Sequence, residues 1–442
     1  MSNDQKTAGR KKHTGWIVVG IIVIAFAVWW VAAAPPDYIK VSPKYVMGKI
    51  PQSNVKVTDK NDILATRMTI EVPELPGHDD LIFQKEKGRA FATGMDGWIW
   101  KIDLKTMKAE KFVDAPLMAS GAVQDPNDIN TLYFCASYLY GETYPENEKV
   151  GIYKLNLETR QITTVADRVP NVPKTFAVPQ GNRGMVYAKG EVSLKQSAMN
   201  DQNSRPAKFC NDLAISRDGR RIYWSEPFAY RGASMGGGAV AEAISLGENG
   251  LLWRLDMETG VVSLIGQGYS FVDGVLLEYD GDSKVESSVL ITETIKFDIL
   301  RFYLTGDKAG RDEVVLKDLP GMPDGLDRAQ NGNILIGLLK KRTALANKLF
   351  AHPWLRQFVL RLPQRVLAGG GNQTGIMILS KDGATPLYCT MHDGSKMSDI
   401  SVLVAHDDRL YMPRFTRYMY GLYSIGDPLG KSKVGTPSVK SP

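Results

Sequence analysis

The sequence has few of the residues that build zinc sites or disulfide frameworks. It contains 3 cysteines and 5 histidines in 442 residues, and Cys135, Cys210 and Cys389 lie far apart. This spacing excludes the paired cysteine and histidine patterns of structural zinc sites and the dense cysteine pattern of small disulfide-bonded domains. One bridge between two of the cysteines stays open as an alternative, but we expect buried free thiols.

A large excess of one charge and long helical periodicity are also lacking. The net charge of +6, from 54 basic and 48 acidic residues, is small for this length, and no basic stripe with interleaved aromatic residues occurs. Nucleic-acid binding is therefore not expected. The 42 glycines, 23 prolines and frequent aromatic residues favour a turn-rich β protein instead.

One uncharged run, near the N-terminus, is long enough to cross a membrane. Residues 16–34 are apolar, with four cations before them and mixed charges after them. A helix of this length spans about 28 Å, close to one hydrocarbon thickness. We predict a cytoplasmic tail at 1–15, a transmembrane signal anchor at 16–34 and a stalk at 35–62, with the remainder on the periplasmic, lumenal or extracellular side. A cleaved signal peptide is the alternative.

The rest of the chain repeats a pattern of short β runs and turns. The unit at 211–226 shows it well: LAIS, a turn containing Asp218-Gly219, and RIYWSE form a hairpin signal. Comparable four-stranded units recur every 45–60 residues or so, and the last one lacks a strand that residues 65–75 can supply. This pattern predicts an all-β fold, a six-bladed β-propeller at 63–430 that follows a single N-terminal transmembrane helix.

Two insertions, at 228–249 and 340–370, interrupt the repeats. The second places eight apolar residues among lysines and arginines, and His352-Pro353 divides it. The pattern indicates a basic amphipathic helical segment, and two interpretations stay open: a membrane-surface or lid element, centred on 340–362, or a helical cap packed on the propeller. We expect the tail at 431–442 to be disordered.

Ordered motifs identify a family resemblance that covers roughly residues 65–425. They are FCNDLAISRDGRRIYWSEP, GLLWRLDMETG, FVDGVLLE, VLITETIKFDILRFYLTGDKAG, LPGMPDGLDRAQNGNILIGLL and HPWLRQFVLRLP. In this order they resemble the strictosidine synthase-like group of six-bladed propellers, especially the membrane-anchored adipocyte plasma membrane-associated protein type. That group is similar in turn to the SMP-30/gluconolactonase and paraoxonase families. One fold can host several reactions, so the resemblance is weak evidence for a substrate.

The resemblance also implies a site at one end of the propeller channel. Asp79, Asn211, Asp273 and Asp324 head their blades where calcium-dependent relatives place metal ligands or substrate contacts. Three carboxylates at one channel mouth repel unless a cation joins them or some hold a proton. Carboxylate and amide oxygens suit Ca²⁺ first and Mg²⁺ second. We expect all four to bind metal, Asp79 and Asp324 to be catalytic, and Asn211 and His392 to contact substrate.

The same comparison of motifs excludes one reaction. The essential Glu of strictosidine synthase falls at Ala405, so amine–aldehyde condensation by that mechanism is not expected. The leading hypothesis is a membrane-anchored, calcium-dependent hydrolase, lactonase- or arylesterase-like, that acts on a small apolar ester or lactone. The alternative is a non-catalytic propeller that serves as a membrane-tethered binding or scaffold module. A transport-associated periplasmic subunit is a third interpretation, which rests on the anchor alone.

Overall fold

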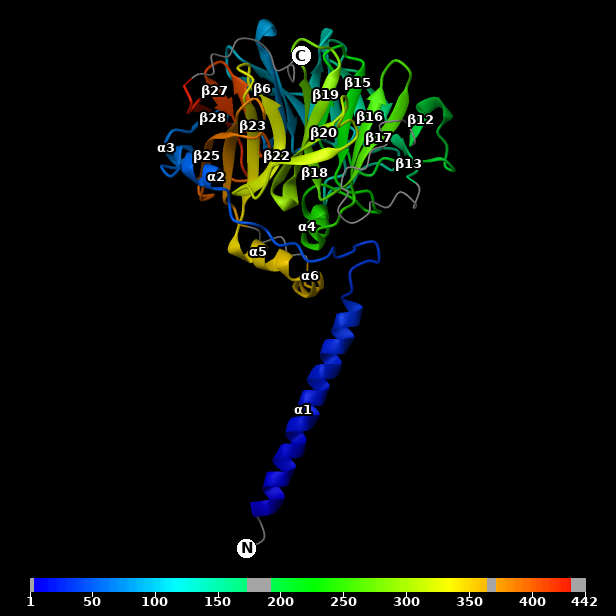
Figure 1. Cartoon of the computed structure of the whole chain (residues 1–442), viewed down its shortest axis with the longest axis vertical. Coiled ribbons are helices and arrows are strands. Elements are labelled where there is room, and N and C mark those ends of the chain that lie inside the picture. The colour runs from blue at the N-terminus through cyan, green and yellow to red at the C-terminus, as the bar shows by residue number, and fades with distance from the viewer. Residues whose placement is uncertain (1–3, 173–191, 364–370, 431–442) are drawn as a thin grey trace.

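The computed structural model describes residues 4–172, 192–363 and 371–430, with side chains from Trp16 onward. Six antiparallel sheets form the body of the molecule, and a long helix projects from one end of it (Figure 1). The all-β six-bladed propeller predicted from the repeats is confirmed. The predicted disordered tail at 431–442 lies outside the described residues, as do residues 1–3 and 364–370.

Each blade has four strands, which run from the channel outward in chain order for the first five blades. The first three blades are β3 (His78–Gln84), β4 (Arg89–Gly94), β5 (Trp98–Asp103) and β6 (Lys108–Asp114); β7 (Met118–Asp125), β8 (Asp128–Ser137), β9 (Gly151–Asn156) and β10 (Ile162–Ala166); and β14 (Leu213–Ile215), β15 (Arg221–Glu226), β16 (Gly250–Asp256) and β17 (Val261–Tyr269). The last three are β18 (Val272–Tyr279), β19 (Glu286–Glu293), β20 (Asp298–Tyr303) and β21 (Asp312–Leu316); β22 (Gly321–Arg328), β23 (Ile334–Lys341), β24 (Thr374–Leu379) and β25 (Pro386–His392); and β26 (Val404–His406), β27 (Arg409–Tyr411), β28 (Leu422–Gly426) and β2 (Thr69–Glu71).

Short elements decorate this frame. Strands β1 (Thr58–Asp59) and β12 (Ser193–Lys195) add to the outer edges of two blades, and β11 (Arg168–Pro170) pairs with β13 (Ser204–Pro206). The helices are α1 (Asp4–Ala32), α2 (Gln52–Val57), α3 (Ile63–Thr66), α4 (Val240–Ser245), α5 (Ala344–Ala351) and α6 (Pro353–Val359). Single 3₁₀ turns are η1 (Lys85–Lys87), η3 (Gln196–Ala198), η4 (Gly236–Ala239) and η5 (Thr294–Lys296).

Apolar side chains fill the space between blades. Alternate residues of each strand face the two neighbouring sheets, so most residues of strands such as β19 and β23 are buried, whichever face they are on. The hairpin predicted at 211–226 is present: β14 pairs with β15, and Gly219 adopts the left-handed conformation in the turn between them.

The ring closes where the ends of the propeller segment meet. Strand β2, from the N-terminal side, pairs with β28 of the last blade, with Thr69 opposite Ser424. The predicted strand at 65–75 therefore completes the sixth blade, which pairs the outer edge of β28 within the ring.

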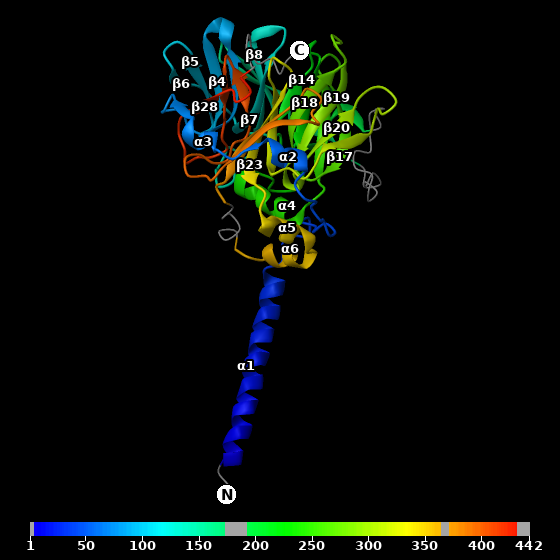
Figure 2. The same cartoon turned by 60° about the vertical axis from the view of Figure 1, so that its left-hand side comes forward.

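Helix α1 stands apart from the propeller (Figures 1 and 2). Among the residues that the structure describes, no helix meets the length and hydropathy criteria for crossing a membrane.

The segment predicted as a stalk lies against the propeller. Its strand β1 pairs in parallel with β25, and the backbone N–H of Tyr45 donates to the carbonyl of Phe350. The guanidinium of Arg342, which is buried, donates to the carbonyl of Gly48. We call residues 37–50 the strap, because these contacts hold that stretch along one end of the propeller.

The expectation of three free thiols is wrong for two of the cysteines. Cys135 in β8 and Cys210, which precedes β14, form a disulfide with their Cα atoms 5.1 Å apart. The two residues are 75 positions apart in the sequence and meet because neighbouring blades bring their strands together. Cys389 is free and buried, and burial raises the pKa of its thiol to about 12.

Both predicted insertions contain helices, and both leave the same end of the propeller. The segment 228–249 contains η4 and α4, and the segment 340–370 contains α5 and α6, divided at His352-Pro353 as predicted. These helices lie between the blades and α1 in both views (Figures 1 and 2).

Candidate functional site

Four of the predicted site residues line one cavity at the channel. Asp79 is the second residue of β3, Asn211 precedes β14, and Asp273 and Asp324 lie near the starts of β18 and β22. They surround a volume of about 30 Å³. Because the innermost strands all start at the same end, their leading side chains converge, and the cavity admits an ion or one to two waters.

The acids that follow two of these residues tie blades together. The Asp80 carboxylate accepts from the backbone N–H of Ala122 in the next blade, at 2.8 Å. The Asp212 carboxylate accepts likewise from the backbone N–H of Val275, at 2.7 Å. Sequence reasoning singled out only the first member of each pair, although the Asp-Asp and Asn-Asp doublets were a visible signal.

The side chain of Thr292 holds the start of β18 beside the start of β22, and so holds Asp273 near Asp324. Thr292 Oγ1 accepts from the N–H of Gly274 at 2.8 Å and donates to the carbonyl of Asp324 at 2.9 Å. A Cβ on Gly274 would lie 2.5 Å from that carbonyl, so a side chain at this position would push the two strands apart. The residue after Asp273 therefore needs to be glycine.

The site concentrates negative charge away from water. Burial raises the pKa of Asp79 and of Asp324 well above its usual value, and the Asp273 carboxylate raises both further. Burial likewise raises the pKa of Asp273, to about 6. The Asp273 carboxylate repels a charged Asp324 beside it, which favours a proton on one of the two when no cation is bound.

The donor set fits a hard cation. Three carboxylates and one amide face a cavity of ionic size, and a cation there would relieve the repulsion between the carboxylates. The ligand atoms of the three channel carboxylates do not all lie within 4.8 Å of one another. Among the described residues, only Asp62, His392 and Asp393 form a set of three His, Cys or acidic side chains whose ligand atoms all lie within 4.8 Å of one another.

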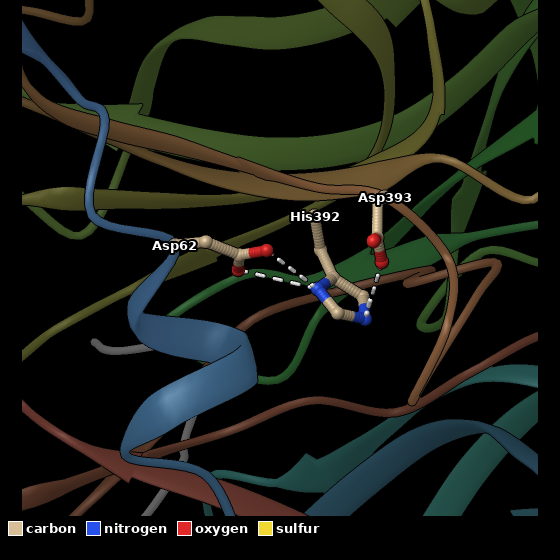
Figure 3. Close-up of side chains that lie close together, drawn as sticks. All are labelled: Asp62, His392 and Asp393. Atoms are coloured by element: carbon tan, nitrogen blue, oxygen red, sulfur yellow. Dashed lines mark hydrogen bonds and ion pairs between the residues drawn. The ribbon is translucent and has the colours of Figure 1, made fainter.

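His392 does not join the channel residues, so its predicted contact with substrate there is corrected. It ends β25, outermost of the four main strands in its blade, where its Nδ1 lies 3.0 Å from Asp62 (Figure 3). Its Nε2 accepts from the backbone N–H of Lys396 at 3.0 Å. Both ring nitrogens are already bonded. The group therefore binds α3 to the fifth blade, although it has the composition of a metal site.

Two further residues considered from the sequence lie outside the cavity lining. His78 is buried, its Nδ1 lies 2.9 Å from the carbonyl of Pro76, and burial lowers its pKa to about 4. Ala405, at the position of the strictosidine synthase Glu, is half-buried in β26. None of the described histidines lines the cavity.

The carboxylate end of the channel is also the helical end of the propeller. Gly321, at the start of β22, pairs with Lys341 at the end of β23, and α5 begins three residues later. In the same way β14 starts beside the end of β15, from which the insertion with α4 leaves. Asn211 and Asp324 thus lie toward the end that carries α4, α5 and α6.

Fold and site together define a six-bladed propeller with an acidic channel. The sequence is similar to strictosidine synthase-like 10 of Arabidopsis thaliana, at 28% identity over 55% of this chain and 64% of that protein. It is also similar to the human adipocyte plasma membrane-associated protein, at 27% identity over 51% and 54%. The predicted resemblance is confirmed; the aligned part spans about half to two thirds of each relative, and no family model matches.

Solved structures with a similar arrangement have low sequence identity. A putative gluconolactonase has a TM-score of 0.48 at 12% identity, covering 86% of this chain and 97% of that one. The calcium-binding protein regucalcin of Agrobacterium tumefaciens has a TM-score of 0.46 at 11% identity, covering 81% and 94%.

Proposed function

We propose that this chain is a membrane-anchored hydrolase that needs a divalent cation, Ca²⁺ first, and cleaves a small apolar lactone or ester. The observation that carries the proposal is the buried channel cavity, in which three carboxylates and one amide converge. Their raised pKa values show that the arrangement is costly without a counter-charge. Such unrelieved charge in a cleft is typical of a functional site.

In this proposal the four channel residues together hold the cation, and one of them is also the general base. Asp273, Asp324, Asn211 and Asp79 would hold the cation, which would polarise the carbonyl of the substrate and stabilise the oxyanion. Asp79 would also be the general base for water, since it lines the cavity and none of the described histidines does. The substrate itself binds outside the 30 Å³ cavity, at the channel mouth.

The proposed anchor is α1, with the propeller on the side away from the cytoplasm. Its apolar side chains from residue 21 to residue 28 are exposed, as at Val23 and Ile24, which are 59% and 65% exposed. An apolar helix that contacts the rest of the protein only at its propeller end favours a lipid environment. The Cys135–Cys210 disulfide supports the same placement, since disulfides persist in oxidising compartments.

Metal analysis and a substrate panel test this function on the full chain in detergent or nanodiscs. We expect about one equivalent of calcium in the protein purified without chelator, and lactone or aryl-ester turnover that EDTA abolishes and added Ca²⁺ restores. Full turnover in excess EDTA would contradict the metal mechanism.

A scaffold function is the second candidate, and one observation favours it. The cavity admits an ion but no organic ligand, and no described histidine reaches it as a base. A bound ion would then be structural. Stoichiometric calcium together with no turnover of any lactone or ester would support this candidate.

A further inference from the structure

The end of the propeller that faces α1 presents two large apolar side chains that the described residues leave exposed. Leu345 of α5 is 71% exposed and Trp354 of α6 is 66% exposed. Large apolar residues that are about two thirds exposed, on two consecutive helices, are unusual for a surface that contacts only water. We call α5, α6 and the strap together the platform.

The helices of the platform already have a buried face. Phe350 and Leu360 are buried against the propeller side, and the fully buried Arg356 donates to the carbonyl of Ser245 at 2.6 Å. A helical cap needs only this inner face. Leu345 and Trp354 lie on the remaining surface, so packing on the propeller does not account for them.

Hydrogen bonds join the parts of the platform to each other and join its end to α1. Arg356 donates to the strap carbonyls of Ser42 and Pro43 at 2.8 and 2.7 Å. Arg361 donates to the carbonyl of Trp30 at 2.9 Å and its guanidinium lies 3.8 Å from the centre of that ring. If α1 enters a membrane, the end of the propeller that carries α4, α5 and α6 therefore faces that membrane (Figures 1 and 2).

The charge of the platform suits an anionic surface. Residues 37–50 and 340–362 contain one acidic residue, Asp37. The exposed lysines of these segments are Lys40, Lys44, Lys49, Lys341 and Lys348. Lysines beside exposed Leu and Trp form the composition of interfacial helices on anionic lipid.

We infer that the platform lies on the surface of the bilayer, with Leu345 and Trp354 among the lipid headgroups, and that the acidic channel opens toward the membrane. The inference rests on the proposed anchoring by α1. It predicts that a substrate reaches the channel mouth from the lipid side, through the gap between propeller and bilayer.

Quenching of single labels tests this geometry in the full chain. Cysteine is introduced at one position at a time, Leu345→Cys, Trp354→Cys, Ile24→Cys or Val285→Cys, and labelled with an environment-sensitive fluorophore. The native Cys389 is buried and the other two cysteines are bridged, so they take up little label. The protein is placed in nanodiscs of phosphatidylcholine and phosphatidylserine that contain spin-labelled lipid at shallow or deep positions.

Val285 is the matched control, because it is 57% exposed and precedes β19 in the hairpin at the opposite end of the propeller. We expect loss of most emission at 345 and 354 with shallow quencher, loss at 24 with deep quencher, and none at 285. Quenching at 24 alone would overturn the platform while leaving the anchor intact, for example if a protein partner or water covers the helices. No quenching at 24 would contradict the anchor itself.

A second measurement tests whether the charge of the lipid holds the platform against the bilayer. Lys341→Glu with Lys348→Glu should reduce the shallow quenching at 354 in anionic nanodiscs and shift it little in neutral ones. Unchanged quenching in both compositions would show that lipid charge does not hold the platform.

Discussion

Two acid-rich groups in this molecule look alike in composition and differ in how their polar atoms are satisfied. The Asp62–His392–Asp393 group has the tighter geometry, yet both nitrogens of His392 already have partners, Asp62 and the N–H of Lys396. The channel group is more open, and its buried carboxylates raise one another's pKa values. Whether the ligand atoms already have hydrogen-bond partners therefore distinguishes a candidate metal site from a structural cluster better than the distances between those atoms do.

The largest expected effect is the loss of cation binding in the channel. Asp324→Asn removes a charged ligand and should lower hydrolysis roughly 100-fold or more, because a lost charge-stabilising group has that magnitude. Turnover and calcium titration would measure it. Asp393→Asn is the matched control, since its side chain is 66% exposed and belongs to the structural cluster, and it should leave both quantities unchanged. Equal losses in the two variants would remove the distinction between the groups.

The next largest effect is on the pH dependence of stability. We expect stability without a cation to fall as pH rises, and the stabilisation by a bound cation to increase. The pKa of Asp273 in the folded state is about 6 and its ordinary value is 3.8, so the folded chain binds more protons than the unfolded one. The stability contributed by the protonated form is present below the ordinary value and is lost as pH rises through about 6, by a few kcal/mol.

Calorimetry in EDTA should therefore show a melting temperature that falls from about pH 4 to about pH 8 for this contribution. Added Ca²⁺ should stabilise the protein increasingly over the same window, because the carboxylates bind it only when deprotonated. A calcium effect that is the same at both ends of the window would contradict the assignment. The Asp324→Asn variant, measured alongside, should show a weakened dependence.

The smallest effect belongs to the satisfied cluster. His392→Leu leaves the N–H of Lys396 without its acceptor and should cost about 1 to 3 kcal/mol in urea unfolding. The difference between unfolding with and without Ca²⁺ should stay at the wild-type value. A variant that loses the calcium effect would place His392 in the metal site after all.

The fold followed from the sequence because its signals are local and repeated. Turns such as Asp218-Gly219 fix hairpins by short-range backbone chemistry, and the missing strand at 65–75 followed from counting strands in each blade. The convergence of Asp79, Asn211, Asp273 and Asp324 came from the motif resemblance, since repeats place equivalent residues at one end.

What the sequence did not reveal depends on contacts between distant segments. The Cys135–Cys210 bridge joins neighbouring blades across 75 residues. The position of His392 depends on α3, which lies on the N-terminal side of the propeller and meets β25 only in the folded ring. The attachment of the strap to the propeller end was not predicted, because it depends on arginines about 300 residues later in the sequence, such as Arg356.

The pairing of β2 with β28 has a consequence for how the protein is made. Thr69 leaves the ribosome about 350 residues before its partner Ser424, an interval of roughly 20 to 70 s at ordinary synthesis rates. During that time β2 has no neighbour in its blade, while the first five blades can already assemble around an open ring. Completion of the fold therefore waits for the last strand, and a chain truncated before Leu422 would leave both sides of that seam without a partner.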